Sequence, residues 1–202
     1  MTKKVVAIHG GNTFSSYEEY FESLKNSEVH LDWMKSKSHW KSTLETNLGS
    51  QYEVFLPRMP LSDNADYELW KLWFEKVLDA LDDTPILVGH SLGAMFLTKY
   101  YSESIQAKKV PAVLLVAPEF FRPKEEEEKK TSFHLTSDIE RLSNNVEKIV
   151  FFYSKDDAVV LFENMEKYKN VVPDAEYQVF TDKGHFLGDD FPEIVEVIKG
   201  LV

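Results

Sequence analysis

Residues 89–93 read Gly-His-Ser-Leu-Gly and directly follow the apolar run 85–88. A serine with a glycine two residues before it and another two residues after it is typical of a sharp turn from a strand into a helix. Such a turn holds the hydroxyl clear of the backbone, where it can attack a carbonyl carbon once a base has taken its proton. Ordinary tight turns share this spacing, so a nucleophile at Ser91 requires partners elsewhere in the chain.

An acidic pair and a histidine follow two apolar runs later in the chain. Ser-Lys-Asp-Asp at 154–157 comes after the run 149–153, and Asp-Lys-Gly-His-Phe at 182–186 comes after the run 177–180. In an open parallel sheet, the ends of such strands form the crevice in which ligands bind. A single aspartate or histidine in a loop is often only a turn residue. The order serine, acid, histidine is the one that a serine on a strand-turn-helix elbow requires.

Short runs of β-branched or apolar residues are the elements that would position these groups. They span 5–8, 52–56, 86–88, 112–117, 149–153 and 177–180. Several are apolar throughout, as expected for strands that are buried on both faces. Stretches with helical periodicity separate them, at 66–81, 92–101, 160–168 and about 191–201. This alternation predicts a three-layer α/β/α sandwich, in which helices cover both faces of a parallel sheet.

The clearest helical pattern lies at 66–81. Its apolar residues fall at i, i+3, i+4, i+7, i+8 and i+11 and share one face: Trp70, Trp73, Phe74, Val77, Leu78 and Leu81. Asp66 is placed to cap the start of this helix. We therefore expect the apolar face, including both tryptophans, to pack in the core.

The composition excludes several classes of protein. The 202-residue chain carries a net charge of −11, which disfavours binding to nucleic acids and to anionic membranes. It has no cysteine, so thiol catalysis, disulfides and iron–sulfur clusters are excluded. The apolar run near the N-terminus is four residues long, whereas a secretory signal needs roughly 7–15 and a membrane span roughly 18. We expect a soluble, cytoplasmic protein.

These motifs together carry a resemblance to a known family. The stretches 89–93, 154–157 and 182–186, and the Ile-His-Gly-Gly-Asn sequence at 8–12, resemble those of the α/β-hydrolase superfamily. Within it the chain is similar to the small serine hydrolases typified by retinoblastoma-binding protein nine and the bacterial YdeN-like proteins. The resemblance covers nearly the whole chain in order. It implies a compact sheet of about six parallel strands, without the antiparallel opening hairpin of larger relatives.

The resemblance also implies a role for each site residue. Ser91 would be the nucleophile, His185 the base and Asp157 the acid that orients it. The loop at 8–12 would carry part of the oxyanion hole, with the backbone N–H of Gly11 as one donor. The N–H of Leu92, at the start of the helix that follows the serine, would be the other donor.

Alternatives remain open for the acid. The family commonly has a proline a few residues after it, whereas this chain has Ala-Val-Val-Leu at 158–161, which leaves Asp156 as a second candidate. Glu119 follows the fourth predicted strand and is a third candidate, because some α/β-hydrolases place their acid there. The offset from the end of the fifth strand favours Asp157.

The remaining histidines are interpreted as structural. We expect His9 to hydrogen-bond within its loop and His90 to pack away from Ser91, although His9 could also line the site. The other three, at positions 30, 39 and 134, lack metal-ligand spacing, so no metal site is predicted.

The sequence therefore predicts one domain over residues 1–202, with a small cap-like excursion at about 119–145. The charged stretch at 124–130 belongs to this excursion. The segment 27–49, which contains Trp33, His39 and Trp40, looks longer than its family counterpart and could alter substrate access.

The predicted function is that of a serine hydrolase which cleaves a small ester, or an amide or peptide, through an acyl-enzyme. No cofactor is required, the partner is a small-molecule substrate, and no protein partner is indicated. The alternative is an interaction protein with the same fold and a vestigial triad, because a fold does not establish a function.

Overall fold

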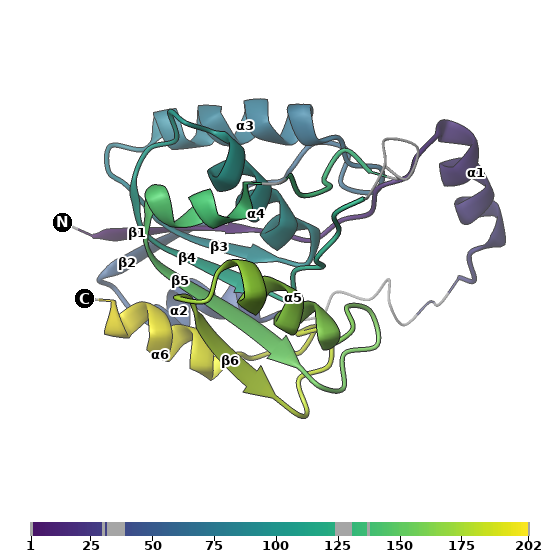
Figure 1. The fold of residues 1–202 in the computed structure, drawn as a ribbon. Coiled ribbons are helices and arrows are strands. Elements are labelled where there is room, and N and C mark those ends of the chain that lie inside the picture. The colour runs from purple at the N-terminus through teal and green to yellow at the C-terminus, as the bar shows by residue number, and fades with distance from the viewer. Residues whose placement is uncertain (1, 30, 32–38, 124–130, 137, 202) are drawn as a thin grey trace.

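In the part of the chain that the structure describes, six strands form one sheet in which all neighbours run parallel (Figure 1). The computed structural model describes residues 2–29, 31, 39–123, 131–136 and 138–201. The strand order is β2-β1-β3-β4-β5-β6. The strands are β1 (Lys3–Ile8), β2 (Tyr52–Phe55), β3 (Ile86–His90), β4 (Val110–Val116), β5 (Val146–Ser154) and β6 (Glu176–Phe180). The prediction of about six parallel strands is confirmed.

The strand order predicts a crevice at the carboxyl ends of β1 and β3. The chain runs from β1 outward to β2, then returns to β3 on the other side of β1. The connections that leave β1 and β3 therefore diverge at their carboxyl ends, and open α/β sheets bind their ligands at such a switch point. The elbow serine directly follows β3, and the Gly-Gly pair at 10–11 follows β1.

Alternating side chains of the strands enter two separate cores. Val6 and Ile8 pack in one core, whereas Val5 and Ala7 pack in the other. The first core contains α3 (Tyr67–Ala80), α4 (Leu92–Glu103), the 3₁₀ helix η3 (Ile139–Asn144) and α5 (Glu163–Val171). The second core contains α2 (Trp40–Leu48) and α6 (Pro192–Gly200). Helices thus cover both faces of the sheet, and the predicted three-layer fold is confirmed.

Helix α3 confirms most of the pattern at 66–81. The side chain of Asp66 accepts a hydrogen bond from the N–H of Leu69 and caps the helix, and Trp70 is fully buried. The prediction for Trp73 was wrong, because its side chain is 43% exposed. The buried stripe consists of Tyr67, Trp70, Phe74 and Leu78, so Trp73 lies at the edge of the apolar face.

Helix α5 begins later than the predicted start at residue 160. The N–H groups of Val159 and Val160 donate to the carboxylate of Asp157, which holds these residues in a turn. The helix therefore begins at Glu163.

Among the described residues, two α-helices and the 3₁₀ helix η3 were not predicted from the sequence. Helix α2 buries Trp40, Leu44 and Leu48 and starts at a cap formed by His39. Helix α1 (Tyr17–Asn26) buries none of its residues, and Figure 1 shows it beyond the carboxyl ends of the strands, outside both layers. Trp33 and the charged stretch 124–130 lie outside the described residues.

The described part of the excursion at 119–145 packs on the first core. Phe133 and Leu135 are buried there together with Ile139 and Leu142 of η3. The buried Lys99 of α4 donates a hydrogen bond to the carbonyl of His134. Among the described residues, no helix combines the length and the apolar character needed to cross a membrane.

Candidate active site

Ser91 lies at an abrupt turn between β3 and α4. Its backbone has φ 55° and ψ −122°, a conformation that residues other than glycine rarely adopt. The N–H of Ser91 donates to the carbonyl of Val116 on β4 at 2.8 Å, which fixes the turn to the sheet. A strained backbone of this kind persists only where the surrounding structure holds it, and such residues cluster at functional sites.

The two flanking glycines allow strand and helix to approach closely. A Cβ atom on Gly89 would lie 2.6 Å from Cα of Ala94, and a Cβ atom on Gly93 would lie 2.6 Å from the carbonyl oxygens of Ile8 and His9. Both distances are far below van der Waals contact, so neither position can carry a side chain without displacing backbone. This geometry explains why the serine needs a glycine two residues away on each side.

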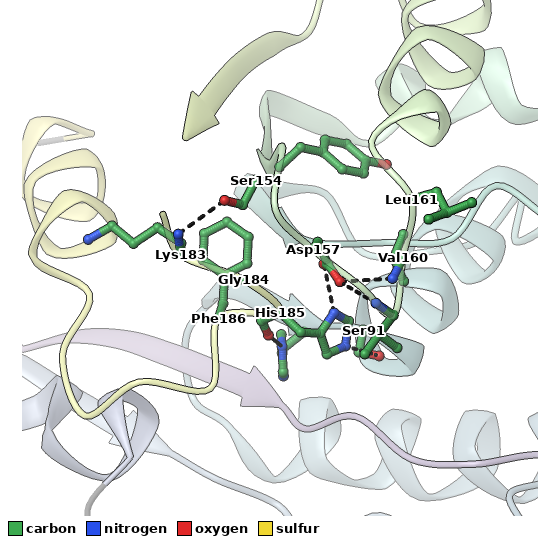
Figure 2. A network of polar contacts seen from close by, with 12 residues as sticks. Ser91, Ser154, Asp157, Val160, Leu161, Lys183, Gly184, His185 and Phe186 are labelled. Carbon is green, nitrogen blue, oxygen red and sulfur yellow. Dashed lines mark hydrogen bonds and ion pairs between the residues drawn. The ribbon is translucent and has the colours of Figure 1, made fainter. Parts of the chain in front are cut away.

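The structure brings together the three side chains that the sequence motifs singled out (Figure 2). Nε2 of His185 lies 3.0 Å from Oγ of Ser91, and Nδ1 of His185 lies 2.8 Å from Oδ2 of Asp157. The side chains of His185 and Asp157 are 9% and 1% exposed. The imidazole therefore connects the hydroxyl to the carboxylate with little contact to solvent.

The carboxylate of Asp157 is held by further donors. Its second oxygen, Oδ1, accepts hydrogen bonds from the N–H groups of Val159 at 2.8 Å and Val160 at 2.9 Å. Two hydrogen bonds of this kind fix the plane of the carboxylate. The turn after β5 thus presents one oxygen to His185.

The two alternative acids lie in other contacts. Oδ1 of Asp156 accepts hydrogen bonds from the hydroxyl of Ser154 and from the N–H of Gly184, and the bond from Ser154 holds the pKa of Asp156 below its usual value. Glu119 offers its backbone carbonyl to the hydroxyl of Tyr168 at 3.1 Å. In the described part of the chain, the carboxylate that pairs with His185 is that of Asp157.

A cleft of about 390 Å³ opens above the serine. Its walls come from the loops after β1, β2, β3 and β6, and the lining residues are Gly10, Gly11, Asn12, Ser62, Asp63, His90, Ser91, His185 and Leu187. A larger cleft of about 560 Å³ lies between α3 and the end of α4. It contains neither Ser91 nor His185, so the smaller cleft is the one that the chemistry can use.

Of the two predicted oxyanion donors, Gly11 lines this cleft and Leu92 directly follows the lining residue Ser91. Leu92 is the first residue of α4, where a backbone N–H has no partner within the helix. Within the residues that the structure describes, neither N–H donates a hydrogen bond to another group, so both are available to an anionic oxygen.

Comparison with known proteins agrees with this geometry. The sequence profile of the family described as serine hydrolase matches residues 32–196. The chain belongs to the serine hydrolase family. The resemblance predicted from the sequence motifs is therefore confirmed.

Two relatives illustrate how far the similarity extends. This serine hydrolase is 26% identical to serine hydrolase RBBP9 of Rattus norvegicus over 152 residues, which cover 75% of this chain and 78% of the relative. The structure of the ydeN gene product of B. subtilis has a TM-score of 0.75 and 19% identity, with 99% of this chain and 98% of that chain covered.

A structure with a named activity shares the fold. The thioesterase domain from the curacin biosynthetic pathway has a TM-score of 0.65 and 14% identity, covering 98% of this chain and 91% of that chain. At this level of identity the likeness extends to the fold alone.

Other histidines of this serine hydrolase have structural contacts. Nε2 of His9 accepts a hydrogen bond from the N–H of Met59 at 2.9 Å, and its ring packs edge-on against Trp70, which confirms its structural interpretation. His90 is buried, and it also borders the cleft together with Ser91. Over the described ranges, no three or more side chains of His, Asp or Glu gather as metal ligands would.

Trp40 was named from the sequence, but its support for the loop of the catalytic histidine was not predicted. Trp40 donates from its indole Nε1 to the carbonyl of Phe186 at 2.9 Å, and from its backbone N–H to the carbonyl of Gly188 at 3.2 Å. The spacing of Trp40, Leu44 and Leu48 at i, i+4 and i+8 was the available signal, because it marks one face of a helix.

Proposed function

We propose that this protein is a carboxylesterase-type serine hydrolase that cleaves a small ester, with amides and peptides as alternative substrates. The observation that carries the proposal is the position of the His185 imidazole, 3.0 Å from the hydroxyl of Ser91 and 2.8 Å from the carboxylate of Asp157. These distances are those of hydrogen bonds, and nucleophile, base and orienting acid in hydrogen-bond reach are the signature of acyl transfer.

In the first half-reaction, His185 takes the proton of Ser91 through Nε2 while Oγ attacks the carbonyl carbon of the substrate. The Nδ1–H group of His185 donates a hydrogen bond to the carboxylate of Asp157, which selects the tautomer with a free Nε2 lone pair and stabilises the imidazolium. His185 then returns a proton to the leaving group, and the acyl group stays on Ser91.

In the second half-reaction, His185 removes a proton from water as the water oxygen attacks the acyl carbon. The bond to Oγ of Ser91 then breaks, His185 returns its proton to Oγ, and the acid is released. In both halves the carbonyl oxygen becomes negative, and the N–H groups of Leu92 and Gly11 stabilise it. Loss of one such donor typically costs about 10²–10³ in turnover. The position of Leu92 at the start of α4 adds the positive end of the helix dipole.

The proposal is tested with a fluorophosphonate probe, which reacts with activated serines. We expect one adduct, located on Ser91 by mass spectrometry, and hydrolysis of p-nitrophenyl acetate by the same sample. The variant Ser91→Ala and heat-denatured protein serve as controls and should show neither. A folded protein that gives no adduct, or an adduct on another serine, would contradict the proposal and favour an interaction protein with an unused triad.

A further inference from the structure

The hydrogen bonds of His90 define its tautomer. Nε2 of His90 lies 2.8 Å from the backbone carbonyl oxygen of His185. A carbonyl oxygen only accepts, so Nε2 carries the proton. His90 is 4% exposed, and burial lowers its pKa well below its usual value. In a neutral ring with a proton on Nε2, the other nitrogen, Nδ1, must be an acceptor.

Lys41 supplies the donor for that nitrogen. Its Nζ lies 3.1 Å from Nδ1 of His90, and it packs over the ring of Trp40 at 4.7 Å from the ring centre. No carboxylate among the described residues pairs with this amine. A lysine that is partly buried without an ion pair carries a desolvation cost, which its contact with His90 offsets only in part.

Helix α2, which contains Lys41, also contacts the loop that follows His185. Trp40, the residue before Lys41, donates to the carbonyls of Phe186 and Gly188. Phe186 has a positive φ of 53°, a strained conformation that needs such support. Hydrogen bonds from α2 and β3 therefore fix the backbone from the carbonyl of His185 to that of Gly188.

We propose that Lys41 is a positioning residue for hydrolysis, which keeps His90 in the tautomer that holds the backbone carbonyl of His185. This inference rests on the proposed function of His185 as the base. Lys41 is not itself a lining residue of the cleft, and its contact is with the lining residue His90, so it acts through His90. A backbone shift at His185 would move Nε2 away from the hydroxyl of Ser91, and small displacements of reacting groups are costly.

The contact does not require a charged lysine. Burial lowers the pKa of Lys41 to about 7, and a neutral amine still donates through its remaining N–H groups. The neighbouring His39 at the start of α2 is itself neutral, because burial lowers its pKa to about 4, and Asp189 opposes that shift. His185 is the other titratable ring beside His90, at 5.1 Å between ring centres.

The test is a double-mutant cycle on kcat with Lys41→Met and His90→Leu. We expect Lys41→Met to lower kcat by about 10-fold and to leave KM within about 2-fold, because the cleft is unchanged. In the His90→Leu background, Lys41→Met should have almost no further effect. Lys41→Arg, which keeps a donor, should restore most of kcat. The matched control is Lys76→Met, an exposed lysine of α3, which should behave as the unmodified protein.

Nitrogen-15 NMR of the His90 ring provides the readout that a merely structural role would not change. In the unmodified protein we expect a proton on Nε2 and none on Nδ1, and in Lys41→Met a mixture of tautomers. A proton on Nδ1 in the unmodified protein overturns the proposal. Because this measurement uses the unmodified protein, it tests the proposal even if Lys41→Met does not fold.

The kinetic outcomes separate two failures. Unchanged kcat in Lys41→Met, or independent effects of the two substitutions, would overturn the role of Lys41 while Ser91 still reacts with fluorophosphonate. Absence of that reaction in the unmodified protein would overturn the proposed function itself.

Discussion

Nδ1 of His185 lies 2.8 Å from Oδ2 of Asp157, although the two residues are 28 positions apart in the chain. The register of the last strand pair brings them together, because Ser154 at the end of β5 lies opposite Phe180 at the end of β6. Each residue then follows its strand by a short loop. The backbone pairing of β5 and β6 thus places the acid near the base. The orientation of the imidazole then depends on the hydrogen bond from Nδ1 of His185 to the carboxylate of Asp157.

Replacing Asp157 by Asn should lower kcat by orders of magnitude. An amide NH₂ opposite Nδ1 selects the wrong tautomer of His185, and the equivalent change in a serine protease costs about 10⁴. Steady-state kinetics on a p-nitrophenyl ester measure the loss, and the melting temperature shows whether the fold survives.

Asp156→Asn and Glu119→Gln serve as the matched carboxylate-to-amide controls for that experiment. Both should keep kcat close to that of the unmodified protein, since neither side chain contacts His185 in the described part of the chain. A large loss in either control, with Asp157→Asn near normal, would show that the acid had been assigned to the wrong residue.

Short acyl chains should be hydrolysed faster than long ones. The cleft above Ser91 has a volume of about 390 Å³, near the lower limit for small-molecule sites, so a long chain would extend beyond it. We expect kcat/KM to be higher for acetate and butyrate than for dodecanoate esters of p-nitrophenol. Equal or higher values for the long chain would contradict the proposed small substrate.

The two tryptophans of α3 should differ sharply in their effect on stability. Trp70 is fully buried and donates to the carbonyl of Pro60, so Trp70→Ala should lower the free energy of unfolding by about 3–5 kcal/mol. Trp73 is 43% exposed, and Trp73→Ala should cost about 1 kcal/mol or less. Urea unfolding of both variants checks this difference, and similar losses would show that Trp73 is buried.

Lys41 should make stability depend on pH above neutrality. Burial lowers its pKa from 10.5 to about 7, so between these values the unfolded chain binds more protons than the native protein. The free energy of unfolding should therefore rise as pH increases from about 7 towards 10, with a slope of the order of 1 kcal/mol per pH unit.

Urea unfolding across this pH range should show that slope in the unmodified protein and in Lys76→Met. It should be absent from Lys41→Met, which cannot titrate at this position. If Lys41→Met showed the same slope, the pH dependence of the free energy of unfolding would come from another titratable group.

The strands and the elbow were predictable because their signals are local. Runs such as 112–117 are apolar throughout, and the serine motif needs only the next few residues on each side. The contact between Ser91 and His185 spans 94 positions, so sequence order could indicate it but not give its geometry. The choice of Asp157 depended on which of two adjacent carboxylates faces the histidine, and backbone hydrogen bonds after β5 decide that orientation.

The helices that were missed gave weaker signals. Helix α1 buries no residue, so no apolar core selects its face, although Tyr17, Tyr20, Phe21 and Leu24 follow helical spacing. Helix α2 is capped by a histidine, which is not among the usual capping residues. The start of α5 depends on the turn around Asp157, a tertiary feature that periodicity cannot reveal.

Strand β6 leads into the loop that carries the base, and among the described strands it lies at the edge of the sheet, paired with β5. Edge elements open by local fluctuations that cost less free energy than global unfolding. Fraying of β6 would separate His185 from Ser91 while the central strands remain paired. Amide hydrogens of β6 should therefore exchange faster than those of β3. Catalytic turnover would then be lost at a lower denaturant concentration than the secondary structure, which makes enzymatic assay a more sensitive measure of sample integrity than circular dichroism.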